Sequence, residues 1–262
     1  MRPDFAPDLF RGTARHYLRH RPTCPRPLID ALLADAHVTG AGRLLDLACG
    51  TGQVALEMAD HFATVLAVDQ EPEMVDVGEE EALRRGITNV TWRVARAEDV
   101  REPPGSVEVV TIGNAFHRLD QPLVARMALD WLPAGRCLVV MGSDGLVSGG
   151  EPWQAMALDI VRRWAERPTP AVERDAPHLT HEEVLLAAGF EDVHEVEFSA
   201  PHVWSVDDVV GHLYSTSFGS KRALGGNVEA FEAELRRALL DLDPGGVFTE
   251  TMQHFYLLGR RP

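Results

Sequence analysis

The chain has 262 residues, 45% of them hydrophobic, and a formal net charge of −15. This length and composition are enough to bury one large core, and they predict a single domain with an inserted cap. The negative charge repels nucleic-acid phosphates and anionic membranes, and no long run of Lys and Arg overrides it, so neither is an expected partner. The acidity fits a cationic substrate, and it fits surface solubility at least as well.

Cysteine usage and apolar runs bear on where the chain works. Cys24, Cys49 and Cys137 show no Cys-x-x-Cys spacing, so they indicate neither a disulfide framework nor a zinc knuckle. The N-terminus has no apolar signal region, and no apolar run approaches the roughly 20 residues that span a bilayer. We therefore expect a soluble protein of a reducing cytoplasm, present as a monomer or homodimer.

In chain order, a helix over residues 27–37 leads to the most informative segment, an apolar strand that carries Asp46 and opens into a glycine turn. Gly50 and Gly52 lack Cβ atoms, so the backbone can turn sharply and come close to a ligand at the start of the next helix. The spacing Gly50-x-Gly52-x-x-Ala55 also fits the dinucleotide fingerprint of an NAD or FAD protein. The charge of Asp46 and the lack of a following Lys-Ser/Thr argue against a polyphosphate ligand.

Further polar landmarks follow later strands. Asp69 ends an apolar strand, where a carboxylate can accept two ribose hydroxyls, and an acidic pair, Glu98 and Asp99, follows the next strand. The strand over residues 107–113 ends in Asn114-Ala-Phe-His. Strands alternate with helices along this part of the chain, which predicts a parallel sheet. Right-handed crossovers then place every landmark at the carboxyl ends of the strands, where open α/β sheets bind ligands.

Together these residues resemble the class I S-adenosylmethionine-dependent methyltransferases, from about Arg11 to the final Gly-Arg-Arg-Pro. The resemblance implies a Rossmann-like, doubly wound α/β fold with a seven-stranded sheet, mostly parallel with one antiparallel strand, plus a helical cap or lid. The antiparallel strand is expected at Thr249–Leu258, beside Glu191–Phe198. Within one domain, the resemblance implies a lid over residues 1–40, a cofactor-binding core over 41–142, and cap insertions for the acceptor at 143–178 and 199–243.

The resemblance also implies S-adenosylmethionine as the cofactor. Gly50 and Gly52 would approach its methionine part, Asp46 its ammonium group and Asp69 its ribose, while Tyr17 closes over it or only packs on the core. Ala48 replaces the commoner Gly but stays small. The residues expected to bind the cofactor are Tyr17, Asp46, Ala48, Gly50, Gly52, Asp69, Gln70, Ala97, Glu98, Asp99, Asn114 and Ala115. Arg21 in the lid is interpreted as structural.

The acceptor side is expected in the cap and just after the fourth strand. His117 is the first choice as general base because an imidazole titrates near neutrality, although it can instead only shape the pocket. Phe116, Trp153, Tyr214 and Ser217 are candidates for contacting the acceptor. Packing is the commoner use of Phe116 and Trp153, and hydroxyls like that of Ser217 often bond the helix backbone.

No metal is expected. His178 and His181 have a short metal-like spacing but no Glu partner on the same helix, and Thr180 is expected to begin that helix. The acidic residues by which magnesium-dependent catechol methyltransferases are recognised are absent after the fourth strand. The Asn-Pro-Pro-aromatic motif of nucleobase and glutamine methyltransferases is absent too. Both departures favour a small-molecule acceptor.

The sequence thus predicts an enzyme that moves the methyl of S-adenosylmethionine to an oxygen or nitrogen of a small metabolite. The pattern resembles enzymes that tailor natural products in secondary metabolism, such as antibiotic biosynthesis, and an aminosugar-containing acceptor is one hypothesis. A carbon acceptor is the alternative, since carbanion formation also needs a base. Two other classes are a nicotinamide-dependent oxidoreductase and a non-catalytic module that binds S-adenosylmethionine.

Overall fold

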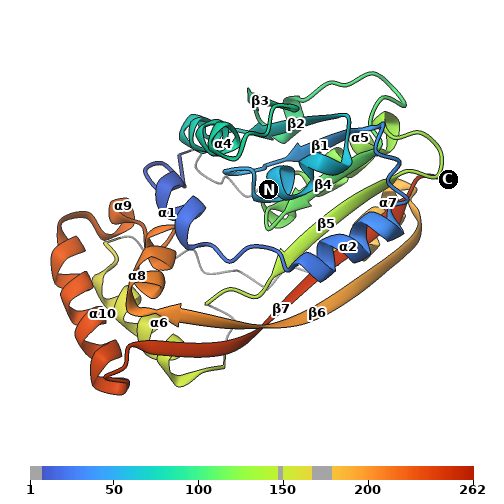
Figure 1. Cartoon of the computed structure of the whole chain (residues 1–262). Helices are drawn as coiled ribbons and strands as arrows, with labels where there is room; N and C mark the ends of the chain where they lie inside the picture. The colour runs from blue at the N-terminus through green and yellow to red at the C-terminus, as the bar shows by residue number, and fades with distance from the viewer. Residues whose placement is uncertain (1–7, 147–149, 167–178) are drawn as a thin grey trace.

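The computed structural model describes residues 8–146, 150–166 and 179–262. Its centre is one seven-stranded sheet with the strand order β3-β2-β1-β4-β5-β7-β6 (Figure 1). Apolar runs of five to seven residues form four parallel inner strands, β1, β2, β4 and β5, as is usual for strands buried on both faces, whereas β3 at the edge of the sheet is largely exposed. The strands are β1 (Arg43–Leu47), β2 (Thr64–Asp69), β3 (Val90–Val94), β4 (Val109–Gly113), β5 (Cys137–Ser143), β6 (Glu191–Ser205) and β7 (Val247–Arg260).

The predicted antiparallel strand is confirmed as β7, which pairs antiparallel with both β5 and β6. The fold class expected from the sequence is therefore confirmed, and six strands run in one direction while β7 runs in the other. Both β6 and β7 are longer than expected, because they continue past the edge of the central sheet. Residues 199–205 belong to β6, although the sequence suggested that they begin a cap insertion.

Helices cover both faces of the sheet. Alternate strand residues point to opposite faces, so Leu44 packs with one helical layer and Leu45 with the other. On one face lie α2 (Arg26–Asp35) and α3 (Gln53–Met58), and on the other lie α5 (Gln121–Trp131) and α7 (His181–Ala188). The helix α2 lies within the residues 1–40 expected to form a lid, yet its apolar side chains are buried in the core against the sheet.

A second lobe surrounds the far ends of β6 and β7 (Figure 1). Its helices are α6 (Pro152–Trp164), α8 (Val206–Tyr214), α9 (Lys221–Leu224) and α10 (Val228–Leu242). They share an apolar core with Trp204 of β6 and with Phe248 and Met252 of β7. We call this lobe the cap. Because the same two strands run through both lobes, the position of the cap is fixed relative to the sheet.

The helix α1 (Ala14–His20) lies between the two lobes (Figure 1). It packs on α8 of the cap and on α4 (Pro72–Arg85), which begins just after β2. The remaining short segments are 3₁₀ turns: η1 (Ala59–His61), η2 (Ala97–Asp99), η3 (Phe116–Arg118) and η4 (Gly225–Asn227). Within the described ranges every helix is too short or too polar to cross a membrane.

Candidate functional site

The glycine turn between β1 and α3 lies close to Tyr17 of α1. Gly50 and Gly52 have positive φ angles of 55° and 78°, which glycine adopts without strain. A Cβ built on Gly50 would lie 3.5 Å from the Tyr17 ring, so Tyr17 of the lid faces the turn. A Cβ on Gly52 would lie 2.4 Å from the Trp92 ring. Gly52 is therefore needed for packing on Trp92 as well as for the turn, which the sequence pattern does not reveal.

Asp69 joins the turn to the start of α4. Its Oδ2 accepts a hydrogen bond from the Gly50 amide at 2.8 Å, and its Oδ1 accepts one from the Glu71 amide at 2.9 Å. Burial raises the pKa of Asp69, while the backbone amides of Glu71, Gly50 and the exposed Gln70 oppose that rise. The carboxylate is thus held in one orientation at the carboxyl end of β2, and each oxygen retains a lone pair for a further donor.

Asp46 is buried more deeply than expected for a residue that contacts the ammonium group of the cofactor. Only 1% of its surface is exposed. Its Oδ1 accepts from the Thr111 hydroxyl at 2.8 Å, and its Oδ2 accepts from the Ala55 amide at 3.2 Å. Burial raises the pKa of Asp46 to about 7. Both oxygens therefore bond the protein itself, linking β1, β4 and the first turn of α3.

Two non-glycine residues of the site have left-handed backbone conformations. Ala48 and Asn114 both have a φ of 52°. This conformation costs an alanine roughly 1–2 kcal/mol, which explains why glycine is commoner at the position of Ala48. Asparagine tolerates it better, and the Asn114 side chain accepts a hydrogen bond from the Ser143 amide at 3.0 Å. Asn114 thereby joins the ends of β4 and β5, next to the buried Ala115.

The two acidic residues after β3, Glu98 and Asp99, lie in different environments. Glu98 is partly buried, and its Oε1 accepts from the Asp120 amide at 3.1 Å. Asp99 is exposed, whereas Ala97 is buried in the core. The three residues form the turn η2 at the same edge of the sheet as Asp69, so they stay together at the side of the site predicted for adenine.

His117 differs from the expectation of an imidazole that titrates near neutrality. Although part of the residue is exposed, desolvation of its ring, Arg118 and His181 together lower its pKa to about 4. The ring is therefore neutral at physiological pH and is a weak base. Its neighbour Phe116 is 1% exposed and packs in the main core, with its ring 5.2 Å from that of His181. This placement favours the packing interpretation of Phe116.

The residues proposed for the acceptor in the cap are mostly enclosed. Trp153 is 4% exposed and packs on Trp204 and Phe248, which favours its packing interpretation. Tyr214 is 3% exposed, and its hydroxyl donates to Glu232 at 2.7 Å. Ser217 is partly exposed in the turn after α8. Of these side chains, Ser217 keeps the most access to solvent.

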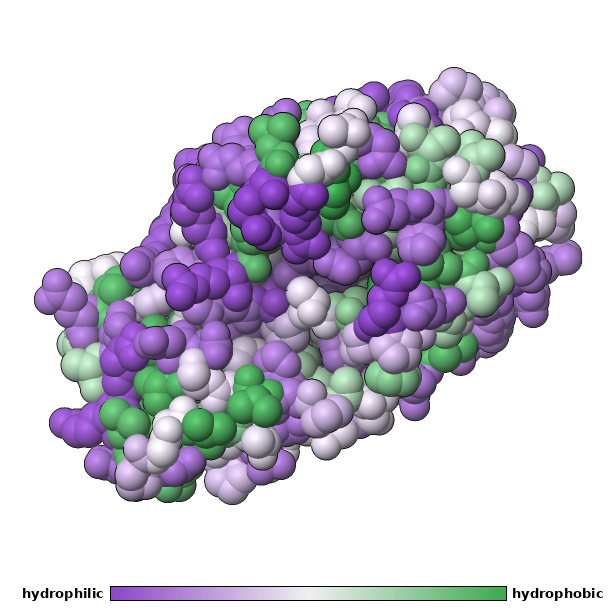
Figure 2. Space-filling view, viewed as in Figure 1, coloured by the Kyte–Doolittle hydropathy of each residue, from purple (hydrophilic) through white to green (hydrophobic). Residues whose placement is uncertain are grey.

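Two arginines near α1, Arg21 and Arg118, were not among the residues predicted to bind the cofactor or the acceptor. The guanidinium of Arg21 lies over the Tyr17 ring, 4.9 Å from its centroid, and that of Arg118 lies over the Phe10 ring at 4.8 Å. The Phe10 and Tyr17 rings meet edge to face at 6.4 Å. In the sequence, the sole signal was the dense run of basic and aromatic residues from Phe10 onward. Figure 2 shows the surface hollowed between the two lobes and bordered largely by hydrophilic residues.

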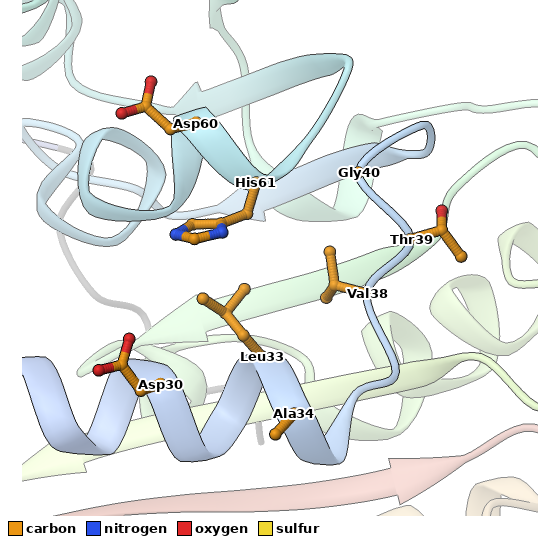
Figure 3. A pocket seen from close by; sticks show the side chains of 8 residues that line it. All are labelled: Asp30, Leu33, Ala34, Val38, Thr39, Gly40, Asp60 and His61. Carbon is orange, nitrogen blue, oxygen red and sulfur yellow. The ribbon is translucent and has the colours of Figure 1, made fainter.

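A pocket of about 460 Å³ lies elsewhere, at the amino ends of β1 and β2. Figure 3 shows the His61 ring of η1 facing Leu33 and Asp30 of α2 across it. Its lining residues are Asp30, Leu33, Ala34, Val38, Thr39, Gly40, Asp60 and His61. Because the glycine turn, Asp69 and His117 all lie at the carboxyl ends of the strands, this pocket is separate from the candidate site.

Two polar atoms at the glycine turn fit a ligand there. The Oγ1 of Thr51 and the Nε2 of Gln53 are buried and have no hydrogen-bond partner among residues 8–146, 150–166 and 179–262. Buried polar atoms are rarely left unpaired, so a polar ligand at this turn would satisfy groups that the chain leaves open. As for metals, His178 lies outside the described residues, and Thr180 is the N-cap of α7, as expected. Among the described residues no group of three or more His, Cys, Asp or Glu is placed to hold a metal ion.

Known proteins are similar to this chain in sequence and in fold. A family model for a methyltransferase domain matches residues 44–132. An uncharacterized methyltransferase of Mycobacterium bovis is 36% identical over 131 residues, which are 48% of this chain and 49% of that protein. The chain thus matches about half the length of this relative. Nocamycin O-methyltransferase of Saccharothrix syringae is 29% identical over 290 residues, covering 97% of this chain and 92% of its own.

Solved structures share the fold at low sequence identity. A protein of Anaeromyxobacter dehalogenans, provisionally named a type II methyltransferase, has a TM-score of 0.61 and 24% identity, covering 92% of this chain and 97% of its own. The [4+2]-cyclase SpnF has a TM-score of 0.54 and 19% identity, covering 93% and 84%. These likenesses concern the fold alone. The family match over residues 44–132 identifies a methyltransferase domain in this chain, and together with the sequence relatives it supports a class I S-adenosylmethionine-dependent methyltransferase.

Proposed function

We propose that the protein transfers the methyl group of S-adenosylmethionine to an oxygen or nitrogen of a small metabolite. One observation carries the proposal: the glycine turn at the carboxyl end of β1 lies between the Tyr17 ring and the Asp69 carboxylate. A turn with open backbone, an aromatic cover and an oriented acid can hold a ligand that has a ribose and a charged tail. When bound, S-adenosylmethionine supplies an electrophilic methyl group.

Each cofactor residue then has a distinct task. Asp69 accepts hydrogen bonds from the ribose hydroxyls, and Thr51 and Gln53 offer unpaired polar atoms to the amino-acid part. Glu98 offers an acceptor to the exocyclic amine of adenine. Tyr17 excludes water from above. The backbone and small side chains of Ala48, Gly50, Gly52, Gln70, Ala97, Asp99, Asn114 and Ala115 border the same volume, and Asp46 supports it from beneath.

The acceptor enters between the cap and the turn η3. Methyl transfer is an in-line displacement, so the protein mainly aligns the acceptor and excludes water. A neutral His117 can accept a hydrogen bond from the acceptor, but its low pKa makes full proton removal unfavourable. That weak basicity favours oxygen or nitrogen acceptors that lose their proton easily over a carbon acid. The similarity to nocamycin O-methyltransferase supports a natural-product substrate for this chain.

An aminosugar acceptor agrees with the acidic composition of the chain but agrees less well with the charges at the site. Arg21 and Arg118 keep two positive charges beside the lid aromatics, and they would repel a protonated amine. The overall charge of −15 therefore does not describe the local field at the site. We retain a small metabolite as the acceptor, with secondary metabolism and antibiotic biosynthesis as its setting.

Calorimetric titration with S-adenosylhomocysteine and, separately, with NADH tests the proposal. NADH is included because the Gly50-x-Gly52-x-x-Ala55 spacing also fits dinucleotides. We expect binding of S-adenosylhomocysteine alone, followed by a gain of one methyl group on an acceptor in a mass-spectrometric screen. Binding of NADH alone would contradict the proposed methyltransferase activity and would indicate an enzyme that transfers hydride. Tight binding of S-adenosylhomocysteine without turnover of any acceptor would favour a non-catalytic binding module.

A further inference from the structure

Two guanidinium groups lie over neighbouring aromatic rings at the candidate site. Arg21 is the residue after α1, and Arg118 ends η3, one residue after His117. They lie over the Tyr17 and Phe10 rings at 4.9 and 4.8 Å, and those rings touch edge to face. The side chains therefore bring positive charge from two distant parts of the sequence to one place, beside the glycine turn.

The charge of Arg21 is held in place by neutral groups. Its Nε donates to the Ser215 hydroxyl at 2.8 Å, and its Nη2 donates to the Ser215 carbonyl at 3.4 Å. Neither acceptor carries a charge that would balance the guanidinium. Burial lowers the pKa of both Arg21 and Arg118, and the charge of Arg21 lowers that of Arg118 further. A buried guanidinium that is held only by neutral groups, as Arg21 is, can bind an anionic ligand.

The neighbouring His117 gives an independent constraint on the acceptor. Its low pKa makes it a weak base, so His117 itself offers little help in removing a firmly held proton. A carboxylate is already ionised at neutral pH and needs no base before it acts as a nucleophile. Carboxylates are also the groups that arginine binds best, through paired N–H donors.

We propose that the acceptor is a carboxylate, bound by Arg21 and Arg118 between the lid and η3, and methylated on a carboxylate oxygen to give a methyl ester. This proposal rests on the methyltransferase activity proposed above. A carboxylate oxygen forms a bond to the methyl carbon while the carbon–sulfur bond breaks, and the electron pair of that bond stays on sulfur. The negative carboxylate and the positive sulfonium become a neutral ester and a neutral thioether, and no proton moves.

The methyl donor carries a carboxylate too, so the test must separate the two sources. The probes are S-adenosylhomocysteine, which has the amino-acid part, and 5′-methylthioadenosine, which lacks it. If Arg21→Gln weakens binding of the first and leaves the second unchanged, Arg21 binds the donor's carboxylate, which overturns its assignment to the acceptor. Equal affinity of wild type and Arg21→Gln for S-adenosylhomocysteine supports the assignment to the acceptor.

The acceptor is then probed by calorimetry on protein saturated with S-adenosylhomocysteine. A panel of simple carboxylic acids, among them benzoic, cinnamic, hexanoic and succinic acid, is compared with the corresponding primary amides, which have the same shape without the charge. We expect at least one acid to bind about tenfold or more tightly than its amide, as for a charge-assisted pair. Arg21→Gln and Arg118→Gln should each remove that preference.

The matched control is Arg15→Gln, because Arg15 lies on α1 but points to solvent, with 76% of its side chain exposed. It should keep the preference for acids. A product readout accompanies binding: methyl groups transferred to an acid should be released as methanol by mild alkali. If S-adenosylhomocysteine binds but no acid binds better than its amide, the carboxylate proposal is refuted and the proposed methyltransferase function is not. If S-adenosylhomocysteine does not bind, the proposed function fails with it.

Discussion

At the scale of single residues, Asp69 is the side chain on which cofactor binding should depend most. Asp69→Ala removes a carboxylate that is already oriented by the Gly50 and Glu71 amides. Loss of charge-assisted hydrogen bonds to ribose should weaken binding of S-adenosylhomocysteine by about 1–3 kcal/mol. Calorimetry measures the change, and Asp76→Ala on the exposed side of α4 is the control. Unchanged affinity in Asp69→Ala would remove Asp69 from the cofactor site.

The buried Asp46 should make stability depend on pH. Its pKa is about 7 in the folded protein, against an ordinary value of 3.8. Between these values the folded state holds a proton that the unfolded state has lost, so this carboxyl contributes stability below about pH 4 that is lost as the pH rises through about 7. Asp46→Asn keeps an acceptor for Ala55 and a polar partner for Thr111 without titrating.

Denaturant unfolding of wild type and Asp46→Asn at about pH 5 and about pH 8 measures this effect. The variant should gain stability relative to wild type as the pH rises. The control is Asp159→Asn, whose carboxylate on α6 is 68% exposed and should show no such trend. Identical pH dependence of wild type and Asp46→Asn would mean that Asp46 is ionised in the folded protein.

At the scale of elements, Glu250 of β7 fastens the cap to the long strands. Its Oε1 accepts from the Trp204 indole and its Oε2 from the Gln154 amide, both at 2.6 Å. Trp204 and Gln154 are almost completely buried. Glu250→Ala leaves both donors unpaired, so unfolding should become easier by about 2–4 kcal/mol. Denaturant titration tests this, with Glu197→Ala on the exposed side of β6 as control. If both variants lose the same free energy of unfolding, Glu250 does not stabilise the attachment of the cap to the strands.

Much of the sheet could be predicted because its signals are local. Apolar runs that end in Asp69 or Asn114 predict both the strands and the edge at which their polar residues gather. The extension of β6 to Ser205 was missed, since alternating polar and apolar residues there also fit a surface segment. The contact of Arg21 with Ser215 joins residues 194 positions apart, and no local pattern encodes it. For the same reason Trp92 was not foreseen below Gly52.

At the scale of the whole molecule, the two lobes should unfold as one unit. The main core and the cap have separate apolar clusters, which by themselves would allow separate transitions. However, β6 and β7 are paired without a break from His194 to Ser205, so the cap cannot leave without opening the edge of the sheet. Cooperativity therefore follows from two long strands rather than from a large contact between helices.

Phe231→Ala tests this coupling from inside the cap. Phe231 is fully buried on α10, and truncating it leaves a cavity that should cost about 3–5 kcal/mol. In a background with Trp92→Phe and Trp131→Phe, tryptophan fluorescence reports on the cap through Trp153, Trp164 and Trp204, and far-ultraviolet circular dichroism reports on the whole fold. If the lobes are coupled, the variant lowers the unfolding midpoint equally by both probes, and the two curves coincide. A fluorescence transition that precedes the loss of secondary structure would instead mean that the cap melts first, carrying Ser215 and hence the support of Arg21 with it.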